Sequence, residues 1–78
     1  MSPKMACQSA KTLIKIFEYF GYTISKRKAG DHIAMRKDGS PRPVIFPDKK
    51  DLPTFIILNN LRTAGITREE YFEALEKL

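Results

Sequence analysis

The chain has 78 residues, of which 42% are hydrophobic and 29% charged, a composition typical of one small globular domain and not of a disordered segment. The single cysteine, Cys7, excludes an internal disulfide, and no apolar run reaches the roughly 20 residues that cross a bilayer. The N-terminus also lacks the apolar core of a signal peptide. We therefore expect a single cytoplasmic domain over residues 1–78, loosely ordered over residues 1–8, with no membrane partner.

The net charge of +5 is concentrated in the middle of the chain. Residues 26–50 hold eight lysines and arginines against three aspartates, a surplus equal to the whole net charge, whereas residues 65–78 are mainly acidic. A basic segment attracts phosphate backbones or anionic surfaces without reading their sequence. The same charges also fit an ordinary solvated surface, so charge alone leaves both interpretations open.

The first predicted element is an amphipathic helix over residues 9–20. Its apolar residues recur at helical spacing: Ala10, Leu13, Ile14, Phe17 and Phe20. Ser9 is the expected N-cap, and Gly21 is expected to end the helix. Ile16 and Tyr19 lie beside this stripe and are expected either to widen it or to be half exposed.

Three strands are predicted to follow. Residues 22–27 and 32–37 alternate in character, with a turn at residues 28–31. Because successive strand side chains point to opposite faces, we expect Ile33 and Met35 in the core and His32 and Arg36 on the open face. An Asp-Gly pair at residues 38–39 signals a hairpin turn. Residues 43–47 are predicted to form the third strand, and the prolines at its two ends favour an edge position or an early end to the pairing.

Two helices complete the chain. Residues 55–58 alone would also fit a buried strand, but the continuation to residue 64 keeps helical spacing, so we predict a helix over residues 53–64. Asp51 or Thr54 is expected to cap its start. Thr67 and Glu70 form a capping box for a last helix. The side chains expected to be buried on that helix are Tyr71, Phe72, Leu75 and Leu78.

The predicted order is α-β-β-β-α-α. This order indicates an α+β domain of two layers, in which helices cover one face of a three-stranded antiparallel sheet. The other face of such a sheet remains open to solvent. His32, the only histidine, is expected on that open face, close to the cations of residues 26–28.

The residue types narrow the possible chemistry. The chain has no glycine-rich phosphate loop and no cluster with metal-ligand spacing, so we expect no cofactor and no metal. A histidine exchanges protons near neutral pH, and on a basic surface it fits a general base acting on a ribose 2′-hydroxyl, which DNA lacks. Two alternatives remain: His32 has a purely structural role, or Cys7 is a nucleophile with His32 as its base.

Four segments, in this order, resemble the HicA-type mRNA interferase toxins of prokaryotic toxin–antitoxin systems. They are Phe20-Gly21-Tyr22, then Gly30-Asp31-His32-Ile33 matching the family's Gly-Ser-His motif, then Lys50-Asp51-Leu52-Pro53, and finally Leu61-Arg62-Thr63-Ala64-Gly65-Ile66. The likeness spans the chain from Lys11 to Phe72.

The resemblance implies a double-stranded-RNA-binding-domain-like fold and a metal-independent endoribonuclease that cleaves mRNA. It implies that His32 is the catalytic residue and that a HicB-type antitoxin covers the site. Gly30 and Asp31 are the candidates for orienting His32. The expected RNA-binding residues are the surrounding cations: Lys26, Arg27, Lys28, Arg36, Lys49 and Lys50.

This sequence departs from the family pattern at two places. Asp31 replaces the motif serine, and residues 55–58 replace the Gly-Thr-Leu-Arg that often begins the second family helix. The helix start therefore lacks an arginine for phosphate. Two alternatives to an active toxin follow: a degenerate toxin or RNA-binding module without catalysis, or an interaction protein that uses the acidic last helix.

Overall fold

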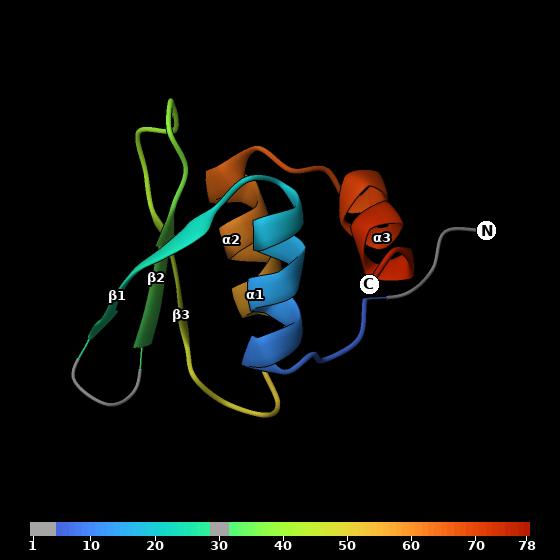
Figure 1. Cartoon of the computed structure of the whole chain (residues 1–78). Helices are drawn as coiled ribbons and strands as arrows, with labels where there is room; N and C mark the ends of the chain where they lie inside the picture. Colours follow the sequence, from blue (N-terminus) through green and yellow to red (C-terminus); the bar gives the residue numbers. More distant parts are fainter. Residues whose placement is uncertain (1–4, 29–31) are drawn as a thin grey trace.

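The computed structural model describes residues 5–28 and 32–78, and for residues 26–28 it describes the backbone only. The elements follow the order α1, β1, β2, β3, α2 and α3. Figure 1 shows α1 and α2 against one side of the sheet, with α3 on the far side of α1. The predicted α+β order and the antiparallel sheet with helices on one side are confirmed, and they agree with a double-stranded-RNA-binding-domain-like fold.

The first helix, α1, spans Ala10–Tyr19. Ser9 caps it as predicted, because its Oγ accepts a hydrogen bond from the backbone N–H of Thr12 at 3.2 Å. Ile16 is fully buried and widens the apolar stripe, whereas Tyr19 remains half exposed. After the helix, Gly21 has a positive φ of 95°, which a residue with a Cβ rarely adopts.

The sheet consists of β1 (Thr23–Lys28), β2 (His32–Arg36) and β3 (Val44–Pro47), in that order and antiparallel throughout. The central strand is β2, and β3 is at an edge as predicted. The register of β1 shifts between Ile24 and Lys26. Ile33 and Met35 are buried and His32 and Arg36 exposed, as expected, but Ala34, which has the same parity as the exposed pair, is also buried.

The second helix, α2, spans Thr54–Ala64. The prediction that Asp51 or Thr54 caps it was wrong: the N-cap is Pro53, and no side chain caps this end. Proline is suited to a helix start because its φ is already near the helical value and its missing N–H would have no intrahelical partner. Gly65 ends the helix in the left-handed conformation, with φ 72°.

The last helix, α3, spans Arg68–Glu76 and begins with the predicted capping box. The Glu70 N–H donates to Thr67 Oγ1 at 3.1 Å, and the Thr67 N–H donates to Glu70 Oε1 at 2.9 Å. Tyr71 is buried as expected, but Leu78 is 54% exposed, so its expected burial was wrong. Helix α3 ends at Glu76, two residues before Leu78.

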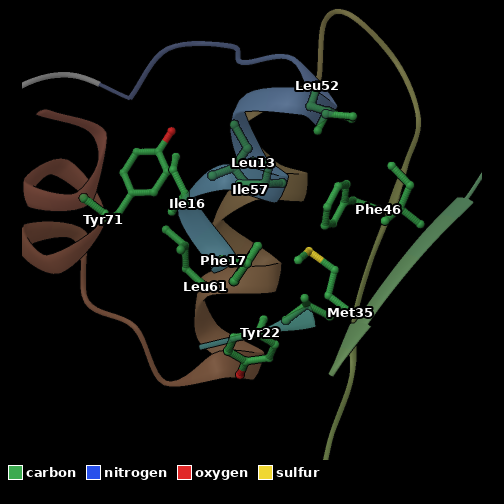
Figure 2. Close-up of a cluster of buried hydrophobic side chains, with 14 residues drawn as sticks. Leu13, Ile16, Phe17, Tyr22, Met35, Phe46, Leu52, Ile57, Leu61 and Tyr71 are labelled. Atoms are coloured by element: carbon green, nitrogen blue, oxygen red, sulfur yellow. The ribbon is translucent and has the colours of Figure 1, made fainter. Parts of the chain in front are cut away.

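The core lies between the sheet and the helices α1 and α2, as Figure 2 shows. Phe17 stacks with Phe46 at 6.1 Å between ring centroids and meets Tyr22 edge-on at 5.3 Å. The chain before α1 is tied to the loop before α2, because the Leu52 N–H donates to the Gln8 carbonyl at 2.8 Å. Within residues 5–28 and 32–78, no helix has the length and apolar character that crossing a bilayer requires.

Candidate active site at His32

His32 is the first residue of the central strand, and its backbone has neighbours on both sides. It pairs with Lys28 of β1 and with Pro47 of β3. A position between two paired strands is held more firmly than one in a loop, while the exposed side chain remains free to meet a ligand. The structure therefore combines a fixed backbone with an accessible imidazole.

The His32 side chain lines a surface hollow of about 350 Å³ between β3 and α2, which we call the His32 groove. One wall comes from β3 and the other from α2. The lining residues are His32, Ile45, Phe46, Pro47, Ile56, Asn59, Asn60 and Thr63. The α2 residues of this groove were not among the candidates that the sequence indicated.

Asn60 fixes one wall of the groove to the other. Its Oδ1 accepts a hydrogen bond from the Ile45 N–H at 3.0 Å, and its Nδ2 donates to the Ile56 carbonyl at 2.9 Å. Asn60 is only 7% exposed, so its amide needs partners inside the protein. In turn it supplies an acceptor for the Ile45 N–H, which belongs to the edge strand. The spacing between β3 and α2, and with it the width of the groove, depends on this residue.

Asn59 and Thr63 bring polar groups to the same groove. Both are exposed on α2, and the Thr63 hydroxyl donates to the Asn59 carbonyl at 3.0 Å. Within the described part of the chain, the Asn59 side-chain amide has no hydrogen-bond partner. This amide, the Thr63 hydroxyl and the imidazole are groups that could meet a polar ligand in the groove.

Three of the predicted RNA-binding cations have side chains that the structure describes, and none of these three lines the groove: Arg36, Lys49 and Lys50. Lys49 and Lys50 line a separate hollow of about 320 Å³ with Ser9, Lys11 and Asp48. That hollow is at the His32 end of the sheet, since residues 49 and 50 closely follow the Pro47 that pairs with His32. The three lysines of this hollow, Lys11, Lys49 and Lys50, make a basic surface at the same end of the sheet as His32.

Arg36 lies at the opposite end of β2. It is four positions along the strand from His32, a distance of about 13 Å at 3.3 Å per residue. It lines a hollow of about 520 Å³ together with Lys37 and the turn at residues 38–40. The backbone of residues 26–28 is in β1, and the candidates Gly30 and Asp31 lie outside the described residues.

Residues 10–66 match the family model described as the HicA toxin of bacterial toxin–antitoxin. The chain belongs to the HicA toxin family. It is thus a toxin of a toxin–antitoxin system, and the resemblance that the sequence motifs indicated is confirmed. A search among curated proteins and a search among solved structures each found no match.

The family match contains the whole His32 groove and ends just before α3. The HicA region thus extends from α1 to the residue after the α2 C-cap. Helix α3 is an addition to this region that packs on α1 and contributes Tyr71 and Ala74 to the core.

Proposed function

We propose that this HicA toxin is a metal-independent endoribonuclease that cleaves mRNA in the cytoplasm, with His32 as its catalytic residue and a HicB-type antitoxin as its inhibitor. The observation that carries the proposal is the exposed His32 at a groove that Asn59 and Thr63 also line, in a chain that belongs to this family. An uncovered histidine on a rigid strand is suited to proton transfer near neutral pH.

The reaction requires a nucleophile that RNA itself supplies. Neutral His32 accepts the proton of a ribose 2′-hydroxyl, and the 2′-oxygen attacks the adjacent phosphorus. The bond from phosphorus to the 5′-oxygen of the next nucleotide breaks, and that oxygen takes up a proton from water. The products are a 2′,3′-cyclic phosphate and a 5′-hydroxyl end. Because the RNA supplies the nucleophile, none of these proposed steps uses a metal or a cofactor.

The phosphate charge is balanced by the cations at the His32 end of the sheet. Lys49 and Lys50 lie in one hollow with Lys11, next to the end of β3 that pairs with His32. Residues 26–28 supply three more cations on the strand that pairs with β2. We propose that these residues bind the RNA backbone, which would make binding strongly dependent on salt. We propose that Gly30 and Asp31, which directly precede His32 in the sequence, orient the imidazole.

The surface around the groove also suits a protein inhibitor. Ile45, which lines the groove, is 41% exposed, and Phe55, beside the groove residue Ile56, is 61% exposed. Exposed apolar side chains next to a polar site are typical of protein interfaces. We propose that the antitoxin covers both side chains and thereby closes access to His32.

The test is expression of the chain without antitoxin, compared with His32→Ala. We expect growth arrest and mRNA degradation with the unaltered chain and neither with the variant. The exposure of His32 means that its replacement should leave the fold intact. Equal arrest and equal degradation by both would show that His32 is not the catalyst.

Three further experiments test the alternatives and the inhibitor assignment. A Cys7→Ser variant should retain full activity, whereas loss of activity would support a cysteine nucleophile. A chain that binds RNA in a salt-dependent way but leaves it intact after long incubation would be the RNA-binding module or degenerate toxin. Restoration of growth by co-expressed HicB-type antitoxin would support the inhibitor assignment.

A further inference from the structure

A second hollow adjoins the His32 groove on α2. This second hollow has a volume of about 400 Å³, and Thr63 lines both. It lies at the C-terminal end of α2, beside the turn at residues 38–40 and the ring of Tyr22. The two hollows thus lie one after the other along α2 and meet at Thr63, and we refer to them together as the depression.

The far end of the depression is basic. Arg62 and Lys37 line the second hollow, and Asp38 is its only acidic residue among those described. Within the described ranges, neither Arg62 nor Lys37 forms an ion pair. Arg36 and Lys37 also line the adjoining hollow on the other side of the turn. Arg62 and Lys37 thus line the end of the depression, and Arg36 lies in the hollow next to it.

Arg62 and Lys37 also have contacts within the protein, which offer a structural alternative to a binding role. Arg62 is in the last turn of α2, where a cation interacts favourably with the helix dipole. The Lys37 Nζ lies 6.0 Å from the centroid of the Tyr22 ring. These contacts do not neutralise either charge. Both charges therefore remain available to an anion.

The dimensions fit a strand of nucleic acid. The two ends of β2 are separated by about 13 Å. Phosphates of a stacked strand are about 3.4 Å apart along the axis, so a strand crossing this span would cover about four nucleotides. Because Lys37 directly follows β2, a strand with one phosphodiester at His32 reaches the end of the sheet where Lys37 lines the second hollow with Arg62.

We propose that Arg62 and Lys37 form a second phosphate-binding site, about four nucleotides from the scissile bond, and that the RNA strand follows α2 between the two sites. The proposal rests on the ribonuclease function proposed above. Asn59 and Thr63 lie along this path and face the intervening nucleotides. RNA is favoured as the occupant over an acidic peptide because the chemistry at one end of the path requires a 2′-hydroxyl.

The test measures RNA binding in the His32→Ala background, so that cleavage does not interfere. The probe is a labelled single-stranded RNA of about twelve nucleotides, three times the span. Arg62→Gln and Lys37→Gln should each lower affinity by about threefold. Each should also reduce the slope of log K against log salt by about 0.7, the value for one lost phosphate contact on a single strand.

Lys15→Gln is the matched control, because it removes the same charge from an exposed position of α1 that lines none of the hollows described here. Thermal unfolding should show all three variants folded, and Arg62→Lys should restore most of the affinity. With a probe of about two nucleotides, too short to span both sites, Arg62→Gln should match the control.

The proposal is overturned if Arg62→Gln and Lys37→Gln bind the long RNA as the Lys15→Gln control does. It is also overturned if these variants lose affinity only for the antitoxin, which would assign the hollow to a protein partner. Failure of the ribonuclease function would give a different result, because the unaltered chain would leave RNA intact. In the His32→Ala background, the slope of log K against log salt would still differ between Arg62→Gln or Lys37→Gln and the Lys15→Gln control.

Discussion

Asn60 and Ile45 join the second helix to the edge strand through a hydrogen bond of 3.0 Å from the Ile45 N–H to the Asn60 amide oxygen. The two residues are 15 positions apart, and each lines the His32 groove. A buried asparagine in an otherwise apolar stripe is costly unless its groups are paired, and here the pairing fixes the site.

Replacement of Asn60 by alanine should therefore be far more damaging than replacement of its neighbour. Asn60→Ala leaves the Ile45 N–H without its acceptor and should lower the free energy of unfolding by about 2 kcal/mol. Asn59→Ala makes the same change in helix propensity at an exposed position, and it should change stability by less than about 0.5 kcal/mol. Urea unfolding of both variants measures the difference, and equal values would contradict the role given to this hydrogen bond.

Tyr71 presents the opposite case, a buried polar group without a partner. It is 1% exposed, and its hydroxyl forms no hydrogen bond with any residue that the structure describes. Tyr71→Phe removes this hydroxyl and keeps the ring, so it should leave stability unchanged or raise it by up to about 1 kcal/mol. Tyr71→Ala should instead lower it by about 3–5 kcal/mol through the cavity it creates. A clear loss of stability in Tyr71→Phe would show that the hydroxyl has a partner.

The same residue gives a pH dependence at the alkaline end. Burial raises the pKa of Tyr71 above its ordinary value of 10.0. Above pH 10 the unfolded chain therefore loses this proton while the native chain keeps it, and stability falls as the pH rises. Because lysines also titrate there, the measured quantity is the difference between the unaltered chain and Tyr71→Phe. That difference should grow in favour of the phenylalanine variant above pH 10, and a constant difference would contradict the prediction.

The capping box of α3 gives a dependence at the acidic end. Hydrogen bonds from the Thr67 backbone and side chain lower the pKa of Glu70 below its ordinary value of 4.5. The carboxylate therefore stabilises the fold above pH 4.5, and this contribution is lost as the pH falls through the lowered pKa. Glutamine can accept the same hydrogen bond but does not titrate. Stability should thus fall more steeply below pH 4.5 in the unaltered chain than in Glu70→Gln, and parallel curves would refute the assignment.

Local signals in the sequence were sufficient for most of the fold. Ser9, Gly65 and the Thr67–Glu70 pair mark helix ends through contacts a few residues apart, and all three are confirmed. Strand alternation was enough to predict that His32 is exposed and Met35 buried. The start of α2 was mispredicted because Asp51 and Thr54 are suitable caps by residue type, whereas the chain enters this helix through Pro53.

The groove could not be predicted, because it depends on how α2 lies against β3. Asn59, Asn60 and Thr63 are distant from His32 in sequence, and only the tertiary fold brings them to it. One signal was present: Asn60 interrupts the apolar stripe between Ile57 and Leu61, where a polar residue calls for a buried partner. The cations predicted as one set lie in separate hollows, because Arg36 and Lys49 are at opposite ends of the sheet.

The central claim is that the imidazole of His32 removes the proton of a ribose 2′-hydroxyl. It is tested most directly by incubating the purified chain with RNA in the presence of a metal chelator, beside His32→Ala. We predict cleavage by the unaltered chain alone, with 2′,3′-cyclic phosphate ends, and no cleavage where the scissile nucleotide carries a 2′-deoxyribose. Cleavage of the deoxy-substituted strand, or equal cleavage by His32→Ala, would contradict the claim.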